Sequence, residues 1–149
     1  MLKYCYEKWN KNKDKLEEAL RKTDLSHVSY RELLILTVEN VFNDDWDTEQ
    51  ITEINNGSYS GTLLYLIPMD YCEPAEYDYL MTYIGYGSCS CCDLLQSIQP
   101  DCDDEPNDED IKNFMSLCKD FVTNMIKPYN AGWRQNDIFE HVTMEEETE

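Results

Sequence analysis

The sequence contains few basic residues. Its 149 residues include 12 lysines and arginines against 31 aspartates and glutamates, and the formal net charge is −19. Segment 1–31 has 8 basic and 5 acidic residues, so it carries +3 and segment 32–149 carries −22. Proteins bind nucleic acid by displacing phosphate counterions with lysine and arginine. This scarcity argues against direct binding of nucleic acid. It favours a basic protein surface as partner, although such acidity is also typical of a face that only keeps a protein soluble.

Long apolar runs are absent too. No run approaches the ~20 residues that span a bilayer, and the longest, residues 62–68, has the length of a strand. The amino terminus lacks the apolar core of a signal peptide. We therefore expect no membrane partner and a cytoplasmic location.

Recognisable catalytic motifs are also missing. The sequence has only two histidines, which lie far apart, and it contains no Gly-x-Ser-x-Gly, no glycine-rich phosphate loop and no His-Glu-x-x-His. The acidic stretch from Asp101 fails the EF-hand pattern, because Pro106 and Lys112 stand where glycine and glutamate are needed. A non-enzymatic protein without a cofactor is the preferred interpretation.

The apolar pattern predicts one α+β domain. The length and the 42% hydrophobic content are those of a globular protein with a real core. Strands clustered in mid-chain favour a three-stranded antiparallel meander packed by helices, in the order α-α-β-β-β-α-α. Residues 1–128 should form this domain, and residues 129–149 an acidic C-terminal tail. The expected helices are 2–22, 29–42, 89–99 and 111–126, and the expected strands are 50–55, 61–68 and 77–86.

Local signals support several of these elements. Ser29 followed by Glu32 fits a capping box at a helix start. The last helix has the strictest amphipathic spacing, so Phe114, Cys118 and Phe121 should be buried across the sheet. Strand 77–86 is apolar on both faces, which predicts cover on both faces.

Two dense groups of carboxylates are the candidate partner-binding residues. If the protein imitates nucleic acid, they should form one contiguous row, with the basic segment 1–31 on the opposite side, where it cannot neutralise them. The first group is Asp44, Asp45 and Asp47, and the second is Asp101, Asp103, Asp104, Glu105, Asp108, Glu109 and Asp110.

The seven cysteines leave three readings open. Cys89 and Cys92 form a Cys-x-x-Cys at a strand-to-helix junction, where a helix N-terminus stabilises thiolate. A zinc site would need further ligands, for which Cys72 or Cys102 are candidates at irregular spacing. A redox pair is the second reading. Small uncoordinated thiols that pack a tight turn are the third and preferred one.

Residues 57–99 carry a resemblance. Residues 61–68, 76–80 and 86–93, the last reading Tyr-Gly-Ser-Cys-Ser-Cys-Cys-Asp, resemble segments of small uncharacterised acidic proteins of phages and prophages, which share Gly-Ser-Cys-Ser-x-Cys-Asp. The resemblance implies a phage-type protein in the cytoplasm of the host cell. The preferred function is binding to a basic surface of a host protein, in one form as a DNA mimic that inhibits host defence or transcription machinery. The alternatives are a small zinc- or thiol-dependent protein centred on Cys89 and Cys92, or a virion or housekeeping phage component.

Overall fold

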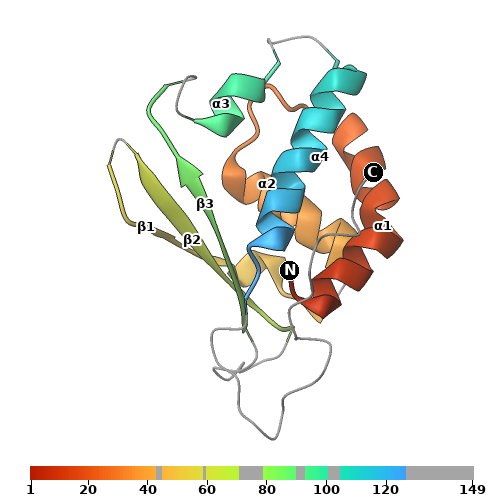
Figure 1. Cartoon of the computed structure of the whole chain (residues 1–149), viewed down its shortest axis with the longest axis vertical. Coiled ribbons are helices and arrows are strands. Elements are labelled where there is room, and N and C mark those ends of the chain that lie inside the picture. The colour runs from red at the N-terminus through yellow and green to blue at the C-terminus, as the bar shows by residue number, and fades with distance from the viewer. Residues whose placement is uncertain (43–44, 59, 71–78, 90–92, 101–104, 127–149) are drawn as a thin grey trace, which may run out of the picture.

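A computed structural model of the chain describes residues 1–42, 45–58, 60–70, 79–89, 93–100 and 105–126. Its elements confirm the α+β class and the predicted order α-α-β-β-β-α-α (Figure 1). The elements are α1 (Lys3–Arg21), α2 (Tyr30–Thr37), the π-helical turn η1 (Val38–Phe42), the 3-10 helix η3 (Thr48–Gln50), β1 (Thr52–Asn55), β2 (Gly61–Pro68), β3 (Tyr79–Tyr86), α3 (Leu94–Ile98) and α4 (Asp108–Thr123).

The three strands form an antiparallel meander with β2 in the centre. The turn between β1 and β2 is held by asparagine side chains: Asn55 Oδ1 accepts from Gly57 N at 2.9 Å, and Asn56 Oδ1 accepts from Thr62 N at 2.7 Å. A Cβ atom at Gly57 would collide with the carbonyl oxygen of Ser60. The turn therefore requires glycine at this position.

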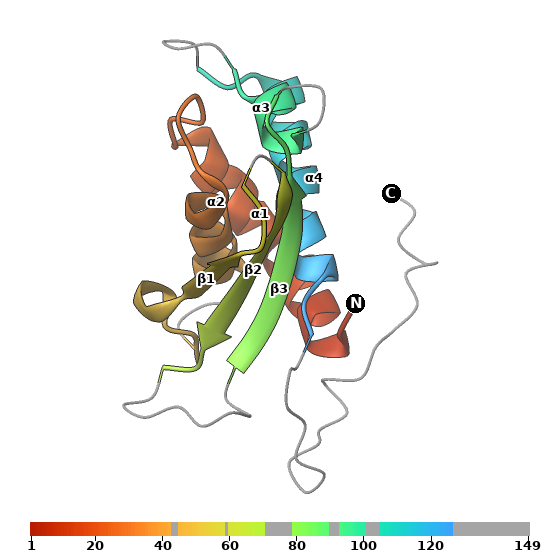
Figure 2. The ribbon, with the colours of Figure 1, turned by 90° about the vertical axis from the view of Figure 1, so that its left-hand side faces the viewer.

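The helices cover one face of the sheet. Seen from the side of the sheet away from the helices, α1, α2 and α4 lie behind the strands (Figure 2). The covered face presents the buried side chains of Leu63, Tyr65, Ile67, Leu80, Thr82 and Ile84.

The opposite face, here called the outer sheet face, has no described helix packed on it (Figure 2). It consists of Thr52, Ile54, Thr62, Leu64, Leu66, Pro68, Tyr79, Met81, Tyr83 and Gly85. Ile54 and Tyr83 are 45% and 42% exposed. The expectation that the third strand is covered on both faces is therefore wrong for this part of the chain, because all described helices pack on one side. Tyrosine, with a polar end on its ring, tolerates this exposure.

Helix α4 packs across the covered face as predicted. Phe114, Cys118 and Phe121 are fully buried. The Phe121 ring meets the Tyr65 ring of β2 edge-on, with 6.0 Å between centroids. Thr82 Oγ1 of β3 donates to the Phe121 carbonyl at 2.6 Å, so a buried hydroxyl group is satisfied.

Helix α2 begins with the predicted capping box, because Ser29 and Glu32 bond to each other's backbone N–H groups. Its apolar face continues through the π-helical turn, where Val38, Val41 and Phe42 are buried. The predicted helix 29–42 thus has the right extent, although its last turn is π-helical.

Asn12 joins α1 to this turn. The sequence pattern treats Asn12 as a polar interruption of the apolar stripe of α1, but the residue is 2% exposed. Its Nδ2 donates to the Val41 carbonyl at 2.7 Å. The hydrogen bond lets a polar side chain occupy a core position.

Replacing Asn12 with leucine should lower the free energy of unfolding by about 1–3 kcal/mol, because the Val41 carbonyl loses its partner in a buried setting. Urea unfolding of the full chain measures the change. Asn10→Leu on the exposed side of α1 is the matched control and should stay within about 0.5 kcal/mol of the parent. Equal stability of the two variants would contradict the role given to Asn12.

Candidate functional site

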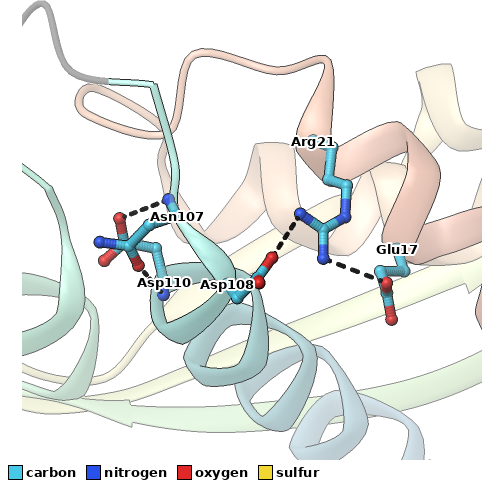
Figure 3. Close-up of polar contacts among 5 residues, drawn as sticks. All are labelled: Glu17, Arg21, Asn107, Asp108 and Asp110. Atoms are coloured by element: carbon cyan, nitrogen blue, oxygen red, sulfur yellow. Dashed lines mark hydrogen bonds and ion pairs between the residues drawn. The ribbon is translucent and has the colours of Figure 1, made fainter.

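The first turn of α4 gathers three of the candidate carboxylates, Asp108, Glu109 and Asp110. The unpaired N–H groups and the helix dipole stabilise negative charge there. Asn107 caps the helix: its side-chain oxygen accepts from Asp110 N at 2.8 Å, and the Asp110 carboxylate accepts from Asn107 N at 3.1 Å (Figure 3). Asp110 therefore has a structural role in capping the helix, whereas Asp108 and Glu109 are exposed.

Arg21 at the end of α1 lies beside this turn. Its Nη1 is 3.0 Å from Asp108 Oδ1, and its Nη2 is 3.4 Å from Glu17 Oε2 (Figure 3). The hydrogen bond to Asp108 holds the pKa of Arg21 above its ordinary value. The expectation that segment 1–31 lies opposite the acidic residues is therefore wrong, because α1 packs along α4 and brings its last turn to the first turn of α4. The pair is exposed and contributes little stability, since solvent screens it.

Negative charge remains in surplus at this end of the molecule. The acidic end, as we call it, comprises the carboxylates of Glu17, Glu18, Glu105, Asp108 and Glu109. Arg21 pairs with two of them, and Lys22 Nζ is 3.1 Å from Glu18 Oε1. Arg21 and Lys22 thus engage Glu17, Glu18 and Asp108, and neither cation pairs with Glu105 or Glu109. Asp101, Asp103 and Asp104 precede this end in the chain and lie outside the described residues.

The other carboxylate group lies at the far end of α1. Asp45 O accepts from Asp70 N at 3.0 Å, and the Asp47 side chain caps η3. Trp46, between them, donates through Nε1 to Tyr4 Oη at the start of α1. The 17 residues from Tyr4 to Arg21 span about 25 Å of helix at 1.5 Å per residue. The candidate partner-binding carboxylates that the structure describes therefore form two separate groups rather than one row. Asp44 lies outside the described residues.

The acidic residues also have a distribution over a longer stretch of the sequence that no short motif describes. Residues 32–111 contain 19 aspartates and glutamates and no lysine or arginine, so this stretch alone accounts for the net charge of the chain. It includes the entire sheet. The cation that reaches the start of β1 is Arg31, whose Nη2 donates to the Ile51 carbonyl at 2.6 Å.

Basic side chains gather instead where α1 packs against α4. Three lysines line a hollow of about 250 Å³ between these helices. The hollow is formed by Trp9, Asn10, Lys13, Lys112, Met115, Ser116 and Lys119. The charge is thus segregated along the sequence: the lysines and arginines lie in segments 1–31 and 112–149, and residues 32–111 between them carry only carboxylates.

The buried carboxylate of Asp93, the residue that follows the Cys-x-x-Cys, accepts three hydrogen bonds. Asp93 Oδ1 accepts from Tyr30 Oη at 2.7 Å and from Gln96 N at 3.1 Å, while Oδ2 accepts from Gly87 N at 3.0 Å. Asp93 N donates to the Cys89 carbonyl at 2.9 Å. Asp93 therefore ties together the end of β3, the start of α3 and α2.

This geometry shifts the start of the helix. The sequence predicts a helix over 89–99, but α3 begins at Leu94 with Asp93 as its N-cap. Cys89 lies ahead of the helix and is exposed, and the helix N-terminus is occupied by a carboxylate instead of a thiolate. No group of three metal-ligating side chains occurs among the described residues. Cys72, Cys92 and Cys102 are not among them.

The network around Asp93 predicts acid sensitivity. Burial raises the pKa of Asp93, but the hydrogen bonds from Gly87, Tyr30 and Gln96 outweigh this effect and hold it below its ordinary value. A lowered pKa in the folded state stabilises the protein above the ordinary carboxyl pKa of about 3.9, and this stability is lost as pH falls through the folded pKa.

Asp93→Asn should therefore unfold at lower urea concentration than the parent at neutral pH, and the difference should shrink toward pH 3. Urea midpoints measured between pH 7 and pH 3 test this. Asp14→Asn, an exposed site on α1, is the control. A constant difference across the pH range would contradict the role of the ionised carboxylate.

Burial also separates the cysteines by reactivity. Cys5 and Cys118 are fully buried, and burial raises the pKa of each thiol to about 12. We expect iodoacetamide to modify exposed Cys89 in the native protein and to reach Cys5 and Cys118 only after denaturation, because the thiolate is the reactive form. Peptide mapping by mass spectrometry reads the order, and native labelling of Cys118 would contradict it.

Comparison with known proteins provides no relative: no family model, no curated protein and no solved structure matches the chain. The resemblance to phage proteins stays a prediction. Among the described residues, no helix combines the length and apolar character needed to cross a membrane.

Proposed function

We propose that this protein is a non-catalytic, phage-type binding protein that attaches to a basic surface of a host protein. The observation that carries the proposal is the charge segregation: a stretch of 80 residues, 32–111, holds 19 carboxylates without one lysine or arginine. A field of one sign concentrates partners of opposite charge and accelerates their encounter.

The acidic end is the proposed point of first contact. Its carboxylates are exposed or half-buried, and Asp108 and Glu109 sit on the first turn of a helix fixed by a reciprocal cap. Neither Arg21 nor Lys22 pairs with Glu105 or Glu109. The described geometry gives less support to the narrower form of the proposal, imitation of DNA. Duplex DNA presents one charge per ~1.7 Å of axis, whereas the two carboxylate groups lie about 25 Å apart along α1.

The test uses the full chain as bait. Protein immobilised through its amino terminus captures partners from host lysate at low salt and at about 0.5 M salt, where charges are screened beyond a few ångströms. Association rates of the captured partner are then measured with a triple variant, Glu105→Gln, Asp108→Asn and Glu109→Gln. We expect the association rate to fall roughly tenfold at low salt, because surface charges act mainly on encounter.

A second triple variant removes the same charge elsewhere. Glu7→Gln, Asp14→Asn and Asp120→Asn lie outside the acidic end, and Asp110 is kept in both variants because it caps α4. The control should bind nearly as fast as the parent. If both variants lost the same fraction of the association rate, net charge alone would explain the effect and the acidic end would have no special role. If both variants bound as fast as the parent, the acidity would serve only to keep the protein soluble.

A further inference from the structure

The two edges of the sheet differ. On the β3 edge, Met81 exchanges backbone hydrogen bonds of 2.9 and 2.8 Å with Ile126, and Asn124 Nδ2 donates to the Tyr83 carbonyl at 3.0 Å. On the other edge, all four residues of β1 are exposed. No other described segment pairs with the side of β1 that faces away from β2. An open edge of this kind can accept a further strand.

The outer sheet face continues an apolar surface to this open edge. None of its ten residues is charged, in a protein with 29% charged residues. Ile54, Leu64 and Tyr83 are paired across the three strands and form one row that ends at β1. Two of the three large, exposed apolar side chains of the described chain belong to this row. A strand added to β1 would extend the row if it placed an apolar residue beside Ile54.

The opposite face of the same edge is acidic. Glu53 follows the other side of the β1 pleat and is exposed, and exposed Glu49 precedes the strand. Arg31 is the cation that reaches this region, through its bond to the Ile51 carbonyl. A residue of an added strand that lies beside Glu53 would therefore meet a carboxylate, which favours lysine or arginine at that position.

We infer that the β1 edge and the outer sheet face receive an extended segment of a partner protein in which apolar residues alternate with lysine or arginine. Backbone hydrogen bonds to β1 supply affinity, the row at Ile54 takes the apolar side chains, and Glu53 selects the basic ones. The inference rests on the proposed function in its choice of a basic partner, but it uses residues outside the acidic end.

Charge argues against two other occupants. A second copy paired antiparallel through β1 would bring the Glu53 side chains of two chains together, and each chain carries −19. The carboxyl-terminal residues 127–149 contain six acidic and two basic residues, so they have the wrong sign. Glu53 thus blocks self-pairing while it accepts a basic strand, a common way to combine binding with specificity.

Synthetic peptides probe the edge directly in the isotopically labelled full chain. The first peptide alternates valine and lysine, the second alternates valine and glutamate, and the third repeats the first with a methylated backbone that cannot donate strand hydrogen bonds. We expect the first alone to shift the amide resonances of Thr52–Asn55 and to slow their hydrogen exchange.

Variants of the chain separate the contributions. Glu53→Lys should weaken the valine–lysine peptide several-fold and strengthen the valine–glutamate peptide, because the charge at the edge is reversed. Ile54→Thr keeps a residue suited to strands and should weaken the first peptide several-fold through lost apolar contact. Leu94→Thr is the matched control, since Leu94 is 44% exposed on α3, away from the sheet face. Its affinity should equal that of the parent.

Four results would overturn the inference. These are no binding of the first peptide, equal binding of its methylated form, shifts confined to the acidic end, and concentration-dependent dimers that broaden the β1 resonances without peptide. The triple variant at Glu105, Asp108 and Glu109 keeps the two proposals apart. Suppose that this variant binds the valine–lysine peptide with parental affinity and also associates with the host partner at the parental rate. The proposal that the acidic end makes the first contact is then wrong, whereas the inference of a binding site at β1 is supported.

Discussion

Phe121 of α4 contacts both the sheet and α2, and these contacts hold the helices against the sheet. Its ring contacts Tyr65 of the central strand and Tyr30 of α2, with centroids 6.0 and 6.5 Å away. Its carbonyl accepts the hydroxyl of Thr82 on β3. Because these contacts fix α4 across the sheet, the chain after the helix meets the β3 edge at Met81, and the first turn of α4 meets the last turn of α1. The closed edge and the acidic end both follow from this anchor.

The local elements of the fold are predictable from sequence, and the reason is that their signals are local. The capping box at Ser29 and Glu32 lies within four residues, and the stripe that buries Phe114 and Phe121 repeats with the helical period. The two-faced pattern of β3 is also visible, but a strand pattern cannot say how many helices are available to cover it. The helices of the described part of the chain all cover one face.

The remaining features depend on pairs that are distant in sequence. Asn12 reaches the Val41 carbonyl 29 positions away, Tyr30 reaches Asp93 over 63 positions, and Arg21 reaches Asp108 over 87. Each residue is ordinary in its own neighbourhood. Asn12 looks like an exposed helix position, and Asp93 looks like part of the cysteine segment until Tyr30 and Gly87 are placed beside it. The sequence therefore predicts which residues carry the charge of the candidate site. Their division between two ends of the molecule could not be predicted, because it depends on how α1 packs on α4.

The pairing of the first helix with the last also orders events during synthesis. Translation at ~5–20 residues per second delivers Asp108 roughly 4–17 s after Arg21. In that interval α1 can pack on the turn at Val38–Phe42, through Asn12, but the side that will meet α4 has no partner. The nascent chain therefore passes through a state in which a cationic, partly apolar helix precedes a long anionic stretch still being made.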